Sequence, residues 1–217
     1  MNLTSRMTQL LGAFRRERNG LVADTMHYDG ARYGLNYGVS LPTMRQIVRG
    51  MERDHEFARF LYRQDVRCLQ LAALHLADPA QLTDPEEFAF WWSGIRNSEL
   101  AEEAAFALFG ALPTLPIRFM EQIEQAEGYP LYLLLMAASR AEQIDAAWVA
   151  PTLRAVARQT GTPCARSVLF GAVNLLAHLA ERGDEATYQA VVTAVASLGT
   201  TAWESTLREE LGWRLYQ

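Results

Sequence analysis

Hydrophobic residues at positions 37–79 recur every three to four positions, in three short segments that each follow a residue suited to capping a helix. Ser40 precedes the first segment, Asp54 the second and Asp65 the third. Side chains of these types accept a hydrogen bond from the first turn of a helix. Asp78-Pro79 closes the third segment, because a residue before proline avoids helical dihedral angles. The pattern therefore predicts three consecutive helices.

The rest of the chain continues this helical periodicity, and no segment alternates with the period of two that marks a strand. Gly20 is expected to end the first helix in the left-handed conformation. Residues 131–140 are almost wholly apolar and must be buried on most sides. The other predicted helices span residues 1–19, 21–28, 83–95, 98–109, 117–125, 131–140, 144–159, 164–182, 184–198 and 201–216.

This succession of helices with short connections predicts one fold class. Repeated antiparallel pairs stack on their neighbours, which gives an all-α, curved α-solenoid of about five to six pairs. A chain of 217 residues, half of them hydrophobic, can bury a sizeable core. We therefore predict a single repeat domain over residues 1–217.

Several classes of protein are excluded by what the chain lacks. No apolar run approaches the roughly 20 residues that span a bilayer, and the N-terminus does not follow the order of a signal peptide. The four histidines and two cysteines form no metal-binding motif, and no cofactor motif is present. We predict a cytoplasmic protein with no membrane segment, no metal and no cofactor.

The distribution of charge bears on nucleic-acid binding. All 20 basic residues are arginine, and the formal net charge is −5. Residues 1–67 hold 11 arginines and seven acidic residues, whereas residues 68–217 hold nine arginines and 18 acidic residues. Binding of nucleic acid would therefore require a local cluster of arginines. The alternative is that the arginines reflect codon usage and solvate the helix faces.

Residues 37–45, YGVSLPTMR, resemble the Gly-Val-x-x-Pro-x-x-Arg signature of the AlkD-like DNA alkylation repair enzymes, a superfamily of HEAT-like helical repeats. Residues 57–79, which end in Ala-Asp-Pro, are similar to the second helix pair of that family. Residues 171–176, GAVNLL, resemble a later segment that usually carries tryptophan. The resemblance implies a HEAT-like fold and a relation to enzymes that excise alkylated purines from DNA on a concave, arginine-lined surface.

The resemblance also indicates candidate site residues. Active members carry a tryptophan and an aspartate four residues apart on one helix, and another tryptophan on a later helix. In this chain Glu99 and Glu103 stand at the first two positions, and Leu175 stands at the third. Glu103 would then be the catalytic carboxylate, which stabilises developing positive charge, while both indoles that contact the cationic sugar are replaced. The candidate DNA contacts are Arg45, Arg49, Arg140, Arg166 and Asn174.

Two functions are therefore open at this point. The chain could be a DNA repair protein that binds damaged or distorted DNA, with or without N-glycosylase activity on alkylated purines. It could instead be a non-enzymatic scaffold that binds a protein partner on its concave surface. Glu99, Glu102 and Glu103 would repel phosphate there and would suit a basic partner.

Overall fold

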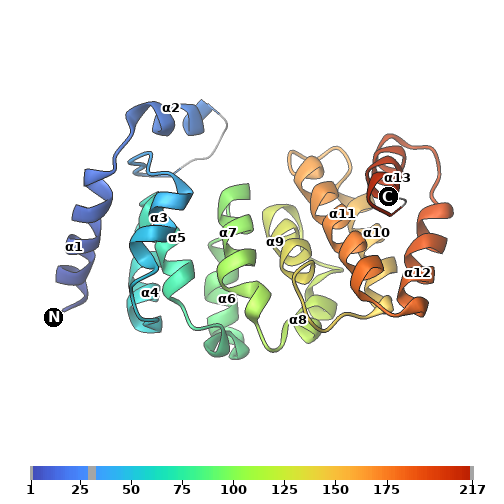
Figure 1. Ribbon diagram of the computed structural model, residues 1–217, viewed down its shortest axis with the longest axis horizontal. Coiled ribbons are helices and arrows are strands. Elements are labelled where there is room, and N and C mark those ends of the chain that lie inside the picture. Colours follow the sequence, from blue (N-terminus) through green and yellow to red (C-terminus); the bar gives the residue numbers. More distant parts are fainter. Residues whose placement is uncertain (1, 29–32, 216–217) are drawn as a thin grey trace. The chain divides into compact units, whose positions relative to one another are not determined.

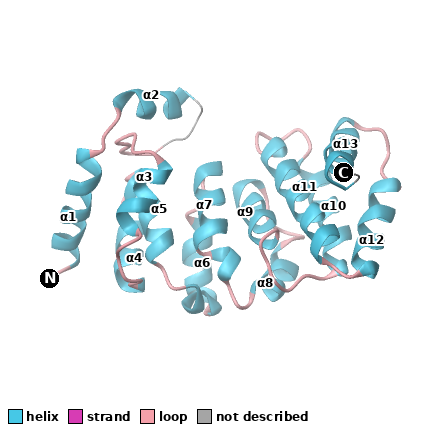
Figure 2. Ribbon diagram, viewed as in Figure 1, coloured by secondary structure: helices cyan, strands magenta, loops and turns pink. Residues whose placement is uncertain are grey.

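The computed structural model describes residues 2–28 and 33–215, and Figures 1 and 2 show helices joined by short loops over this range. The described residues contain no strand. An isolated β-bridge joins Leu35 to Val66. The predicted all-α class is therefore confirmed. The chain divides into two compact units, Met1–Glu87 and Phe88–Gln217, and a single domain over the whole chain stays a prediction.

The first unit begins with a run of five α-helices. Two of the three predicted caps are confirmed, because the Ser40 and Asp54 side chains accept hydrogen bonds from the backbone N–H groups of Thr43 and Phe57. Each such cap contributes about 1 kcal/mol. The elements are α1 (Leu3–Arg16), α2 (Gly20–Tyr28), α3 (Leu41–Val48), α4 (His55–Tyr62), α5 (Arg67–Leu76) and the 3-10 helix η1 (Pro79–Thr83).

The third predicted cap, Asp65, is wrong. Val66 immediately precedes α5, and it makes no side-chain capping hydrogen bond. The backbone around Asp65 instead pairs with an earlier loop, since the Asp65 carbonyl accepts a hydrogen bond from the N–H of Leu35 at 2.9 Å. Gly34 lies so close to Asp65 that a β-carbon at position 34 would meet that residue. Val66 therefore occupies the capping position, and Asp65 before it is held by a long-range backbone contact.

The predicted role of Gly20 is also wrong. The first helix ends at Arg16, and Gly20 is the first residue of α2 and does not have a positive φ angle. Asn19 caps α2 through a hydrogen bond of 3.3 Å from the Val22 N–H to its side chain. The left-handed glycine of this region is Gly38, with φ of 67°, and a β-carbon there would overlap the backbone of Asn19.

A polar group ties α4 to the segment that follows α5. The Nδ1 atom of His55 accepts a hydrogen bond of 3.2 Å from the Asp78 N–H, so the ring proton is on Nε2, which lies 3.1 Å from the Glu87 carboxylate. Arg59 also forms an ion pair with Glu87. Burial, and then the nearby charge of Arg59, lower the pKa of His55 and favour this neutral form.

The second unit continues the helical succession from within α6. Its helix α9 is buried from Leu131 to Ala138, as the apolar run predicts. The elements are α6 (Pro85–Ser93), α7 (Ser98–Ala107), η2 (Phe109–Ala111), α8 (Leu115–Gln122), α9 (Gly128–Ala138), η3 (Ala146–Trp148), α10 (Val149–Gln159), α11 (Ala165–Arg182), α12 (Glu185–Ala196) and α13 (Ala202–Leu215).

The helices of the second unit after α6 lie in two rows (Figure 1). Helices α7, α9, α11 and α13 contact one another in that order and form what we call the odd row. Helices α8, α10 and α12 form the even row, which packs against α9 and α11. The core includes the fully buried aromatic side chains Phe119, on α8, and Trp148, at the end of η3, whose rings stack with centroids 4.5 Å apart. The odd row positions the residues considered next.

Candidate nucleic-acid interface

The helix α7 holds the two predicted catalytic positions, and it places them differently. Its first turn is fixed by Asn97, whose side chain accepts a hydrogen bond of 2.8 Å from the Leu100 N–H. Glu103 lies on the inward side of the helix and is only 2% exposed, whereas Glu99 is half-buried. A carboxylate this deeply buried cannot contact a DNA strand at the surface in this conformation.

A different pair with the same spacing of four residues faces solvent on α7. Glu102 is exposed, and Phe106 is 50% exposed. The hydroxyl group of Tyr132, on α9, donates a hydrogen bond of 2.8 Å to the Glu102 carboxylate. Burial, and then the Glu102 carboxylate, raise the pKa of Tyr132 above its ordinary value. The residues that α7 exposes, Glu102 and Phe106, therefore lie three positions after Glu99 and Glu103, the positions that the family resemblance indicates.

The helix α11 shows a similar displacement. Leu175 is fully buried, and its neighbour Asn174 is partly exposed. The helix can approach α9 closely because of Gly171, where a β-carbon would lie 3.0 Å from side-chain atoms of both Tyr132 and Leu135. The outward face of α11 carries residues spaced by four, one turn apart, and these are Arg166, Phe170, Asn174 and His178.

Polar side chains from three segments of the odd row meet in an open pocket of about 260 Å³. Arg214, on α13, donates a hydrogen bond of 2.9 Å to the amide oxygen of Asn174. The amide nitrogen of Asn174 in turn donates to the Phe170 carbonyl at 2.9 Å, which fixes the orientation of the amide group. The pocket is lined by Met136, Ser139, Arg140, Asn174, Ala177, His178, Glu181 and Arg214.

Two further contacts set the chemistry of this pocket. The Nε2 atom of His178 lies 2.8 Å from the Ala141 carbonyl, to which it must donate a proton. The guanidinium of Arg140 lies 5.4 Å from the centre of the Phe106 ring, within the range of a cation–π contact. Glu181 is the acidic member of the lining. The pocket thus presents two guanidinium groups, one of them oriented by the Asn174 amide oxygen, and guanidinium groups suit a phosphate or another anion.

The arginines of the two rows have different partners. In the even row, Arg154 and Arg158 both bind the Glu124 carboxylate and lower its pKa, and Arg118 pairs with Glu121 at 2.9 Å. In the odd row, no carboxylate within the described part of the chain lies at salt-bridge distance from Arg140, Arg166 or Arg214. These three cations are available to an external anion.

The structure therefore brings together only part of the predicted set. Arg140 and Asn174 line one pocket, and Arg166 lies on the same face of α11 as Asn174. Arg45, which is half-buried, belongs to α3 of the first unit, and Arg49, which is exposed, is the residue that follows this helix. Arg214 was missed by the sequence-based prediction, because the last turn of the final helix carries no motif, and only the contact with Asn174 reveals it.

Metal-ligating side chains, cysteines and long apolar helices indicate other kinds of site. The described residues contain no group of three or more His, Cys, Asp or Glu side chains that could hold a metal ion. Both cysteines are free, with Cys68 buried and Cys164 partly exposed. In the same part of the chain, no helix has the length and apolar character needed to cross a membrane.

Comparison with known proteins gives one relationship, through structure. No protein-family model and no curated protein sequence matches the chain. A solved structure from a new family of proteins related to the HEAT-like repeat DNA glycosylases, with affinity for branched DNA structures, matches with a TM-score of 0.71. The match covers 99% of this chain and 96% of that chain at 14% sequence identity. The predicted HEAT-like solenoid fold, and the resemblance to that superfamily in fold, are confirmed.

Proposed function

We propose that this protein is a divergent relative of the HEAT-like repeat DNA glycosylases that binds branched DNA through the odd row of its second unit. The observation that carries the proposal is the pocket in which Arg140 and Arg214 flank Asn174 without a paired carboxylate. The full-length structural match to a protein family with affinity for branched DNA supports the choice of ligand.

The charge of the second unit favours a branched ligand over a long duplex. Residues 88–217 hold nine arginines and 14 acidic residues, so the unit as a whole repels a phosphate backbone. A small cluster of cations can overcome this repulsion only where several phosphates converge. Strands that meet at a branch point bring phosphates together in this way, and a linear duplex does not.

Base excision is not part of the proposal. The predicted catalytic carboxylate, Glu103, is shielded from solvent, and Leu175 belongs to the core. The surface of the odd row offers no indole at either position. Incubation of methylated DNA with excess protein should therefore release no 7-methylguanine above the level without protein, and clear release would show that the proposal omits an activity.

Binding can be tested by fluorescence anisotropy with a labelled four-way junction and a linear duplex of the same base composition, at 50 to 200 mM salt. We expect the junction to bind more tightly. Arg140→Ala combined with Arg214→Ala should weaken junction binding by about tenfold and reduce the slope of log affinity against log salt by about two.

The matched control combines Arg154→Ala with Arg158→Ala, which removes the same number of arginines from the even row. This variant should bind the junction like the wild type. Equal losses in the two double variants, or equal affinity for junction and duplex in the wild type, would contradict the proposal.

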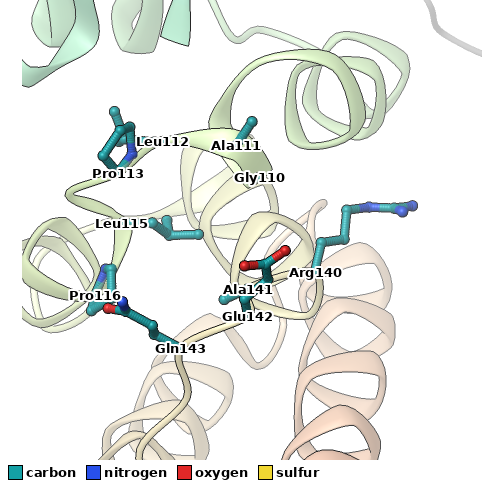
Figure 3. Close-up of a pocket in the computed structure, with 10 residues that line it drawn as sticks. All are labelled: Gly110, Ala111, Leu112, Pro113, Leu115, Pro116, Arg140, Ala141, Glu142 and Gln143. Atoms are coloured by element: carbon teal, nitrogen blue, oxygen red, sulfur yellow. The ribbon is translucent and has the colours of Figure 1, made fainter. Parts of the chain in front are cut away.

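A second candidate function, binding of a protein partner, is supported by a different surface. A pocket of about 410 Å³ lies between residues 110–116 and residues 140–143 (Figure 3), and a second of about 390 Å³ shares Pro116 and Gln143 with it. In Figure 3 the Glu142 carboxylate is directed toward the other lining residues, whereas Arg140 extends away from them. Beside these pockets, Ile117 is 61% exposed and Met120 is 46% exposed.

Apolar side chains beside the unpaired Glu142 would suit a basic amphipathic peptide. This candidate predicts that a labelled Lys/Leu peptide binds and that a Glu/Leu peptide of equal length does not. Ile117→Glu combined with Met120→Glu should abolish peptide binding and leave junction binding unchanged. Loss of junction binding in that variant would instead place DNA on the even row.

A further inference from the structure

The exposed apolar side chains of the second unit divide by type between the two rows. Phe106 and Phe170 are both half-exposed, and Trp213 is 67% exposed. These three aromatic residues belong to α7, α11 and α13 of the odd row. The large exposed aliphatic residues of this unit that the structure describes, Ile117 and Met120, belong to α8 of the even row. Aromatic rings are thus exposed on the row that carries the unpaired arginines.

Phe106 is held at the surface and is not buried against the core. The Arg140 guanidinium covers the ring at 5.4 Å, and this contact orients both side chains. The ring retains half of its accessible surface, and exposure of that much apolar area is unfavourable in water. A second flat, apolar group could stack on the exposed part of the ring.

Phe170 belongs to α11, the helix that also carries Asn174 and His178 of the same pocket. It is one turn before Asn174 on α11, and its carbonyl accepts the Asn174 amide hydrogen bond. Asn174 is also bound by Arg214 and lines the pocket that we assign to phosphate, so Phe170 lies one helical turn from a residue of that pocket. Arg166 lies one turn earlier on the same face of the helix. Phe106 therefore contacts a cation of the pocket, and Phe170 lies one helical turn from both Arg166 and Asn174 on the exposed face of α11.

We propose that Phe106 and Phe170 are stacking platforms for unpaired bases, so that the preferred ligand is a DNA branch point that carries unpaired nucleotides. This inference rests on the proposed function and adds to it that the bound bases are unpaired. The faces of bases in a continuous duplex are already stacked on their neighbours. Unpaired bases at a branch expose theirs, and stacking of a base on an aromatic side chain is favourable for every base type.

The test uses two junctions that share one sequence, one fully paired and one with four unpaired nucleotides at the branch. Phe106→Ala and Phe170→Ala should each weaken binding of the junction with unpaired nucleotides by about tenfold, with less than about a twofold effect on the paired junction. Ile117→Ala and Met120→Ala, at exposed apolar residues of the even row, are the controls and should change neither affinity. Phe106→Tyr and Phe170→Tyr should restore most of the lost affinity, because a phenol ring still stacks.

A third ligand separates stacking from contacts with the backbone. Abasic residues in place of the four unpaired nucleotides keep every phosphate and remove the bases. The wild type should bind this ligand about as weakly as it binds the paired junction, and Phe106→Ala should cause little further loss. Tight binding of the abasic ligand by the wild type would overturn the inference.

The remaining outcomes distinguish the inference from the function on which it rests. If the wild type binds no branched DNA, the proposed function fails. If it binds branched DNA but the alanine variants lose affinity equally for all ligands, or lose none, the stacking role fails and the proposed function stands. An alanine variant that loses its helical circular dichroism signal is unfolded and does not test the stacking role. The tyrosine variants and the abasic ligand then provide the test, because neither depends on the folding of an alanine variant.

Discussion

The two helix rows of the second unit use arginine in different ways. In the even row, Arg154 and Arg158 share the Glu124 carboxylate, so their charges are neutralised within the protein. In the odd row, Arg140 lies on an aromatic ring and Arg214 binds a neutral amide, so their charges are oriented but not neutralised. An amide or an aromatic ring can orient a guanidinium group without adding a negative charge. A carboxylate also orients the group, but its charge repels an incoming anion.

This difference shows why the total charge is a poor guide to function here. The second unit is acidic overall, yet its carboxylates are distributed so that one row is internally paired and the other keeps available cations. The same distinction applies to apolar residues, because the odd row exposes aromatic rings and α8 exposes aliphatic side chains. A comparison of the rows therefore predicts which substitutions affect stability, which affect binding and which affect neither.

The largest expected effect is on stability, and it should differ between two neighbouring residues of α11. Leu175→Ala removes a fully buried side chain and should lower the free energy of unfolding by about 2–5 kcal/mol. Asn174→Ala should cost about 1 kcal/mol or less, because its contacts are at the surface, but should weaken junction binding. Urea denaturation and anisotropy measure the two effects. A stable Leu175→Ala variant that no longer binds DNA would place Leu175 at the binding surface.

A smaller effect is expected at the hydrogen bond that joins α7 to α9. Tyr132→Phe removes a buried hydroxyl that donates to the Glu102 carboxylate, and should lower stability by about 1–2 kcal/mol at neutral pH. Because the pKa of Tyr132 is raised in the folded state, the folded protein keeps this proton above pH 10, where the unfolded chain loses it. Stability of the wild type should therefore fall above pH 10 by up to about 1.4 kcal/mol per pH unit relative to the variant.

The contribution of Tyr132 to the loss of stability at alkaline pH can be measured by comparing urea denaturation of the wild type and Tyr132→Phe from pH 8 to 11. The two curves should converge as the pH rises, since the hydroxyl's advantage is lost once the unfolded tyrosine ionises. Parallel curves over this range would mean that the pKa of Tyr132 is not raised in the folded protein.

A modest effect on binding is expected from the two adjacent carboxylates of α7. Glu102→Gln removes an exposed negative charge from the odd row and should raise junction affinity about two- to threefold at 100 mM salt. Glu103→Gln removes a buried group and should leave junction affinity within about 1.5-fold of the wild type, since the charge does not face the ligand. The opposite ranking in an anisotropy titration would show that Glu103 faces the DNA.

The smallest effect is expected from the even row. Glu124→Gln frees Arg154 and Arg158 from their ion pairs, but these arginines do not line the odd-row pocket. Junction affinity at 150 mM salt should therefore change by less than about twofold, because surface charges outside the interface are screened. A large gain would mean that freed cations of the even row contact DNA directly, and that the two rows are not functionally distinct.

Helical periodicity and capping residues were sufficient to predict much of the fold. Ser40 and Asp54 act as predicted because a cap involves only neighbouring residues of the chain. The apolar run of α9 is buried as predicted, since no other placement removes it from water. Asp65 and Gly20 were predicted wrongly, because α5 begins one residue later than its apolar pattern indicates, after Val66, and Asn19 caps α2.

The surface of the odd row was decided by tertiary packing. The sequence contains Glu99, Glu103 and Leu175 at positions that resemble a known site, but the rotation of each helix sets which residues face outward. Close packing of α11 on α9 at Gly171 turns Asn174 outward and Leu175 inward, and α7 is turned so that Glu102 and Phe106 are exposed.

The sequence by itself therefore determined the helices, their order and the fold class, because these depend on local propensity and on the period of the apolar residues. The tertiary structure alone decided which charges meet. Arg214 and Asn174 are 40 residues apart, and nothing in their local sequence indicates a hydrogen bond between them. A rotation of about 100° per residue around a helix means that an alignment error of one position moves a side chain from the surface to the core.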